Sequence, residues 1–107
     1  MIDQLSSLIQ AIHDSPGRAM IVTSGAGALA LAELLAVGGA SRTVVEAVIP
    51  YSPAAFDDFL GQTPAHYVAD ATARLLAGRA YTRGRWLEGA TSPLVGVACT
   101  AAIASDR

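Results

Sequence analysis

Lysine is missing from this chain, and cysteine occurs only once. All seven basic residues among the 107 are arginine, so no lysine is available for a Schiff base, a Ser-Lys dyad or a phosphate-binding P-loop. The single Cys99 excludes a disulfide within the chain and is typical of a protein in a reducing compartment. We therefore expect a cytoplasmic protein.

Charged residues are also scarce, and their placement excludes further classes of protein. Only 15% of the residues are charged, the net charge is −2, and the arginines are scattered along the chain. A nucleic-acid-binding face would gather its basic residues instead. No group of His, Cys, Asp or Glu has the spacing of a metal site. We expect no nucleic-acid partner, no metal and no cofactor.

The sequence shows no pattern of a membrane span or a secretory leader. Residues 1–18 carry polar side chains throughout, which a signal peptide would not tolerate. Residues 19–37 are mostly apolar but include Ser24, Gly25 and Glu33, so a buried strand followed by a packed helix explains them better than a span. We expect no membrane partner.

Apolar patterning predicts alternating helices and strands. Helices are expected over residues 2–12, 28–37, 53–60 and from 63 to about 86, and strands over residues 19–23, 43–49 and 94–99. This order favours an α/β fold of three α/β/α layers with a small, mostly parallel or mixed sheet, formed by residues 1–107 as a single domain. Three strands make a small sheet. We therefore expect the domain to be incomplete at its C-terminal end and either completed as a homo-oligomer or fused to a further domain.

The turn after the first predicted strand, Thr23-Ser24-Gly25-Ala26-Gly27, is the strongest local signal for a site. Its glycines allow a tight turn, and the N-terminus of the following helix favours an anion or a developing oxyanion. Ser24 would be a nucleophile at the carboxyl end of the strand, where α/β sheets bind ligands. Alternatively, Ser24 only caps the helix.

The same turn also resembles a dinucleotide-binding fingerprint. Gly25-x-Gly27-x-x-Ala30 follows a predicted strand, and Glu46 lies about 20 residues further on, as an acidic ribose ligand would. Alanine replaces the third glycine, and Glu46 falls in the middle of its strand. A truncated dinucleotide-binding domain is therefore a further hypothesis for this chain.

Tyr51 follows the second predicted strand. If the two strands are parallel neighbours, its hydroxyl reaches the same sheet edge as Ser24, where it would relay a proton or simply pack against the next helix. Other polar residues have no predicted catalytic or binding role. We expect His13 at an exposed helix end, His66 in the first turn of the long helix, and Asp57 on a solvated helix face.

Three motifs in this order resemble the C-terminal domain family of the competence/damage-inducible protein CinA. The family pattern A-E-S-C-T-G-G aligns with residues 22–28, Y-S-N-x-x-K with residues 51–56, and G-x-A-x-T-G-x-A-G-P with residues 96–105, where Gly96, Ala98 and Thr100 are kept. The likeness extends over roughly residues 3–105. Phe56 stands where the family has its lysine, so activation of Ser24 would fall to Tyr51 or to a group that the motifs do not identify.

The resemblance implies hydrolysis of the carboxamide of nicotinamide mononucleotide. Ser24 would attack the carboxamide, and Tyr51 would assist proton transfer. The substrate would be bound by the turn and the later motifs, at Thr23, Gly25, Ala26, Gly27, Ser52 and Thr100. The alternative is a non-catalytic module of a larger protein that binds a nucleotide or oligomerises.

Overall fold

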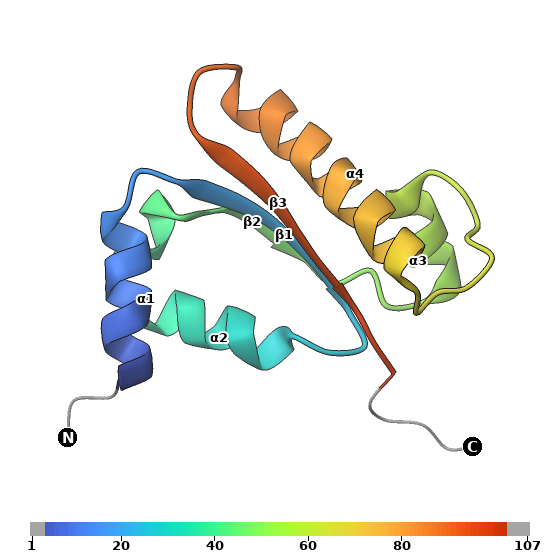
Figure 1. Ribbon diagram of the computed structural model, residues 1–107, viewed down its shortest axis with the longest axis horizontal. Helices are drawn as coiled ribbons and strands as arrows, with labels where there is room; N and C mark the ends of the chain where they lie inside the picture. Colours follow the sequence, from blue (N-terminus) through green and yellow to red (C-terminus); the bar gives the residue numbers. More distant parts are fainter. Residues whose placement is uncertain (1–3, 103–107) are drawn as a thin grey trace.

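The computed structural model describes residues 4–102 and forms an α/β fold (Figure 1). Its elements are α1 (Gln4–Asp14), β1 (Arg18–Ser24), α2 (Ala28–Ala36), a short 3₁₀ helix η1 (Ala40–Arg42), β2 (Val44–Val48), α3 (Pro53–Leu60), α4 (Asp70–Glu88) and β3 (Leu94–Thr100). The predicted order of helices and strands is therefore confirmed, although residues 2–3 of the first expected helix lie outside the described part of the chain.

The sheet has three parallel strands in the order β2-β1-β3. Helices α1 and α2 lie on one face, and α3 and α4 lie on the other, so the three-layer arrangement is confirmed (Figure 1). Because β1 is central and parallel to both neighbours, all three strands end at the same edge of the sheet. That edge carries the turn into α2.

The side chains of β1 alternate between two apolar clusters. Met20 and Val22 face α3 and α4, where they pack against Phe56, Leu76 and Ala80. On the other face, a smaller cluster joins Ala19 and Ile21 of the strand to Leu31 of α2. A strand buried on both faces has an uninterrupted apolar sequence, which explains the Ala-Met-Ile-Val run of β1.

Helix α4 lies against β3 at two glycines. A Cβ added at Gly96 would come within 2.3 Å of the Ala77 carbonyl oxygen, and one at Gly84 within 2.9 Å of the Leu94 side chain. Only residues without a side chain permit this approach. The contact fixes Leu94, Gly96 and Ala98 on the α4 side of the sheet.

The long helix begins later than the Thr63-Pro64 pair predicts, at Asp70. Residues 62–69 instead fold back over α3, where the Thr63 and Tyr67 hydroxyls each donate to the Asp57 carboxylate at 2.8 Å. Asp57 is half-buried and is a hydrogen-bond acceptor for this loop, whereas its neighbour Asp58 is exposed, as expected of a solvated helix face. Within residues 4–102, no helix is both long enough and apolar enough to cross a bilayer.

Candidate functional site

The turn between β1 and α2 leaves the first turn of α2 without a side-chain cap. Gly25 and Gly27 have φ angles of 88° and 102°, in the left-handed region that favours glycine. Gly27 is the N-cap residue, and within residues 4–102 no side chain caps the helix. Ser24 therefore does not cap α2, and the positive end of the helix dipole faces the turn.

A pocket of about 260 Å³ lies in front of this helix end. It is lined by Thr23 of β1, the turn, the first residues of α2, and the chain that follows β2: Thr23, Gly25, Ala26, Gly27, Ala28, Leu29, Ile49 and Tyr51. Among residues 4–102, no charged side chain lines it. The sequence therefore predicted four of its residues as substrate-binding positions and Tyr51 as a catalytic one. It missed Ala28, which ends the first aligned motif but was given no role, and Leu29 and Ile49, which lie outside the motifs.

Thr23 and Tyr51 give this pocket its hydroxyl groups. Thr23 is buried, with 5% of its surface exposed, whereas Tyr51 is 69% exposed. Since β1 and β2 are parallel neighbours, Tyr51 follows β2 at the edge where β1 also ends, as predicted. The pocket thus combines a buried threonine on one wall with an exposed phenol on the other.

Ser24 does not line this pocket. The alternation of β1 places Ser24 on the same face as Met20 and Val22, and it is 9% exposed. Its partner in the β1–β3 register is Thr100, whose hydroxyl donates to the Tyr67 carbonyl oxygen at 2.8 Å. The predicted pair of Ser24 and Tyr51 therefore shares one sheet edge but not one cavity.

Gly25 and Ser52, both predicted to bind substrate, also have structural roles within the fold. A Cβ at Gly25 would lie 1.6 Å from the Ala101 carbonyl oxygen, so this glycine admits the chain that leaves β3. The Ser52 hydroxyl accepts from the Ala55 N–H at 3.2 Å and caps α3. Positions 103–105 of the last motif lie outside the described residues.

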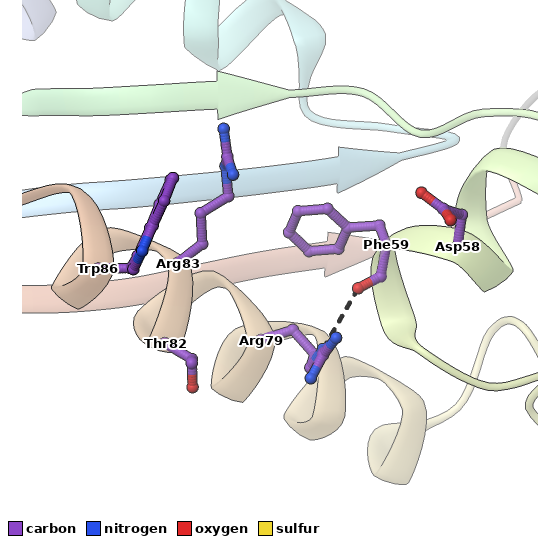
Figure 2. Close-up of a pocket in the computed structure, with 6 residues that line it drawn as sticks. All are labelled: Asp58, Phe59, Arg79, Thr82, Arg83 and Trp86. Atoms are coloured by element: carbon purple, nitrogen blue, oxygen red, sulfur yellow. Dashed lines mark hydrogen bonds between the residues drawn. The ribbon is translucent and has the colours of Figure 1, made fainter.

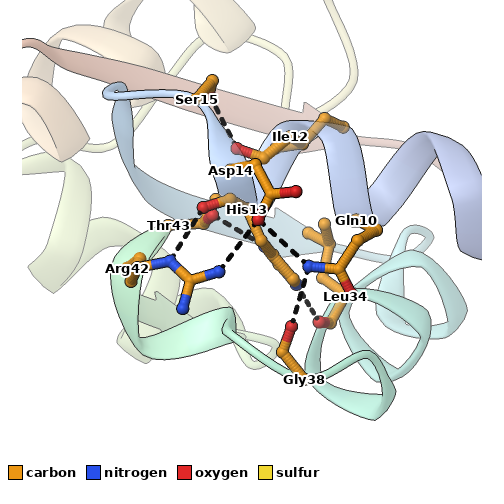
Figure 3. Close-up of polar contacts among 9 residues, drawn as sticks. All are labelled: Gln10, Ile12, His13, Asp14, Ser15, Leu34, Gly38, Arg42 and Thr43. Atoms are coloured by element: carbon orange, nitrogen blue, oxygen red, sulfur yellow. Dashed lines mark hydrogen bonds and ion pairs between the residues drawn. The ribbon is translucent and has the colours of Figure 1, made fainter.

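His13 is fully buried, so its expected exposure is wrong. Figure 3 shows the polar contacts of its ring. Its Nε2 lies 2.9 Å from the Leu34 carbonyl oxygen, and its Nδ1 lies 2.7 Å from the Thr43 hydroxyl. A carbonyl oxygen only accepts, so Nε2 donates, and in the neutral ring Nδ1 accepts from Thr43. The ring joins α1, α2 and the start of β2. His66 also differs from its prediction because it precedes α4.

A second pocket of about 410 Å³ lies between α3 and α4 (Figure 2). Arg79, Arg83 and Trp86 line it from one side of α4, and Trp86 is 76% exposed and so does not belong to the core. Arg83 also binds Glu46 of β2 through two hydrogen bonds. These bonds hold the pKa of the Glu46 carboxyl below its usual range and raise the pKa of Arg83.

The pairing of Glu46 removes support for a dinucleotide site at the turn. Glu46 is held against α4 by Arg83, while the turn pocket includes the first residues of α2 on the other face of the sheet. Among residues 4–102, no three His, Cys, Asp or Glu side chains gather as metal ligands would.

Comparisons with known proteins do not assign the chain to a family. The sequence matches no protein-family model, and no curated protein or solved structure is significantly similar to it. The resemblance to the CinA C-terminal domain stays a prediction.

Proposed function

We propose that this domain binds a phosphorylated small molecule of the nicotinamide mononucleotide class in the turn pocket, the cavity in front of Gly27. The observation that carries the proposal is the uncapped N-terminus of α2 at the base of a cavity of about 260 Å³. Free N–H groups and the positive end of the dipole favour a phosphate there. The absence of any charged lining residue leaves this helix end as the main electrostatic feature of the pocket.

The remaining lining residues fit the rest of such a ligand. The exposed ring of Tyr51 offers a surface on which a planar base stacks, and Leu29 and Ile49 supply apolar walls. The Thr23 hydroxyl offers a hydrogen bond from the buried side. Gly27 lets the phosphate approach the backbone because it has no side chain.

A calorimetric titration tests this proposal with matched ligands and variants. Nicotinamide mononucleotide should bind, and nicotinamide riboside, which lacks the phosphate, should bind at least about tenfold more weakly. Tyr51→Ala should weaken binding by about tenfold through lost stacking, and Thr23→Val should weaken it with little change in shape. Tyr81→Ala, at a half-exposed ring on α4, is the control and should bind as the wild type does. Equal affinity for both ligands, or unchanged affinity in the Tyr51 and Thr23 variants, would overturn the proposal.

Hydrolysis of the carboxamide by Ser24 is the second candidate. It is favoured by the meeting of Ser24, Thr100 and Tyr51 at one edge of the sheet, and disfavoured by the absence of Ser24 from the pocket lining. Ammonia release from nicotinamide mononucleotide distinguishes the two. Release that Ser24→Ala abolishes would support hydrolysis, whereas binding without ammonia would support a binding module. The single cysteine supports a cytoplasmic location for either activity.

A further inference from the structure

One face of β3 is apolar and is not covered by the helices on its side of the sheet. Gly96 faces α4, so alternation turns Val95 and Val97 toward the layer of α1 and α2. There they remain 55% and 45% exposed, and neither belongs to the apolar cluster beneath α2. All-parallel sheets usually have both faces covered by helices, so this half of the sheet is incomplete within residues 4–102.

The uncovered strand is continuous with apolar side chains of α1 and α2. Val95 and Ile12 line one cavity, and Ile12, Leu8 and Leu29 line the next, a groove of about 450 Å³ between the two helices. Leu8 is 59% exposed and Leu29 is 74% exposed. We call the surface formed by these residues the apolar face; its large side chains are Leu5, Leu8, Ile12, Leu29, Val95 and Val97.

We propose that the apolar face binds a second copy of this chain, with α1 of each copy seated on β3 of its partner. Each copy has both surfaces that this contact needs: the uncovered face of β3, and helices α1 and α2 with exposed apolar side chains. Such a patch is self-complementary, as an interface with twofold symmetry must be. This proposal does not rest on ligand binding in the turn pocket, although Leu29 lines both the pocket and the apolar face.

The charge and the size of the apolar face also fit a self-association. No charged residue occurs in β3, and among residues 4–102 Glu33 is the only one that lines the groove between α1 and α2. Arg18 and Arg85 line the cavity shared by Ile12 and Val95, but Arg18 forms an ion pair with Glu88 and Arg85 donates to two backbone carbonyl oxygens. Two identical faces therefore meet with little repulsion. A fully exposed Leu or Ile side chain has about 130 Å² of surface, and Val has about 100 Å². With these values, the exposed fractions of the six large side chains of the apolar face give roughly 400 Å² of apolar surface. One partner of a standard interface contributes about 450 Å² of apolar surface.

Sedimentation of the whole chain, at concentrations from about 1 to about 100 µM, tests the proposal. The wild type should form a dimer in this range, and Val97→Lys or Leu8→Lys should raise its dissociation constant by at least about tenfold. Leu75→Lys is the matched control, since Leu75 is a half-exposed leucine on α4, on the far side of the sheet. Circular dichroism of each variant verifies that it is folded.

A cross-linking experiment tests the reciprocal arrangement in the same molecules. In a Cys99→Ser background, one chain carries Leu8→Cys and the other carries Val97→Cys. A short bismaleimide should join the two chains efficiently in the mixture. A monomer at every concentration, a dimer unaffected by Val97→Lys and Leu8→Lys, equal loss with Leu75→Lys, or no cross-link in the mixture would each overturn the proposal.

Discussion

Thr23 of β1 and Tyr51, in the chain that follows the parallel neighbour β2, line one pocket in front of Gly27. Ser24, the next residue of β1, faces the opposite helix layer because side chains alternate along a strand. A hydroxyl on each wall and an uncapped helix end at the base form a site that suits an anionic ligand.

Gly25→Ala should unfold or strongly destabilise the domain. The added Cβ would lie 1.6 Å from the Ala101 carbonyl oxygen, and the φ angle of 88° is one that alanine rarely adopts. Strain and displacement together should cost at least about 2–3 kcal/mol of the free energy of unfolding. Denaturant unfolding measures this loss.

Gly17→Ala is the control for that substitution. Gly17 lies in a turn, no heavy atom lies within 4 Å of an added Cβ, and its φ is not in the left-handed region. Its free energy of unfolding should stay within about 1 kcal/mol of the wild type. If both glycine variants were equally stable, the role given to the Ala101 contact would be wrong.

His13→Ala should lower the free energy of unfolding by about 3 kcal/mol. It leaves the Thr43 hydroxyl and the Leu34 carbonyl without their buried partner and opens a cavity at a fully buried position. His66→Ala removes an exposed side chain, and its effect should be within about 0.5 kcal/mol. Thermal and denaturant unfolding of both variants make the comparison, and similar losses would contradict it.

Glu46 should titrate at a lower pH than an unpaired glutamate, because Arg83 stabilises its charged form through hydrogen bonds. A carboxyl whose pKa is lowered by folding stabilises the fold above its unfolded pKa and loses that contribution as the pH falls through the folded pKa. A pH titration followed by carbon NMR of the Glu46 carboxyl should therefore show a higher titration midpoint in the Arg83→Gln variant than in the wild type. Arg74→Gln, an exposed arginine elsewhere on α4, should leave the midpoint unchanged. If Arg83→Gln left the titration midpoint of Glu46 unchanged, the pairing of Glu46 with Arg83 would be disproved.

The sequence was a good guide to the fold because its strands are short apolar runs between turn signals. The Ser52-Pro53 start of α3 was equally readable, since a cap and a first-turn proline act locally. The start of α4 was not, because long-range hydrogen bonds to Asp57 hold residues 62–69 out of the helix. His13 did carry a signal, as it lies four residues after Ile9 on the apolar side of α1.

The candidate site could be placed only in part from the sequence. The glycine turn marked the pocket correctly, but which hydroxyl enters it depends on where β1 ends and how its side chains alternate. A strand that ends at Thr23 leaves Ser24 in the turn, whereas the strand observed includes Ser24 and turns its side chain away. Because the strand continues for one more residue, its alternation places Ser24 on the face opposite to Thr23.

Amide NMR of the labelled domain, titrated with nicotinamide mononucleotide, tests the central claim most directly. The account predicts that the largest shifts fall on the N–H groups of Gly27, Ala28 and Leu29, with a smaller shift at Tyr51, and that they shrink when the riboside replaces the phosphorylated ligand. Shifts confined to the pocket beside Trp86, or no shifts at saturating ligand, would contradict it.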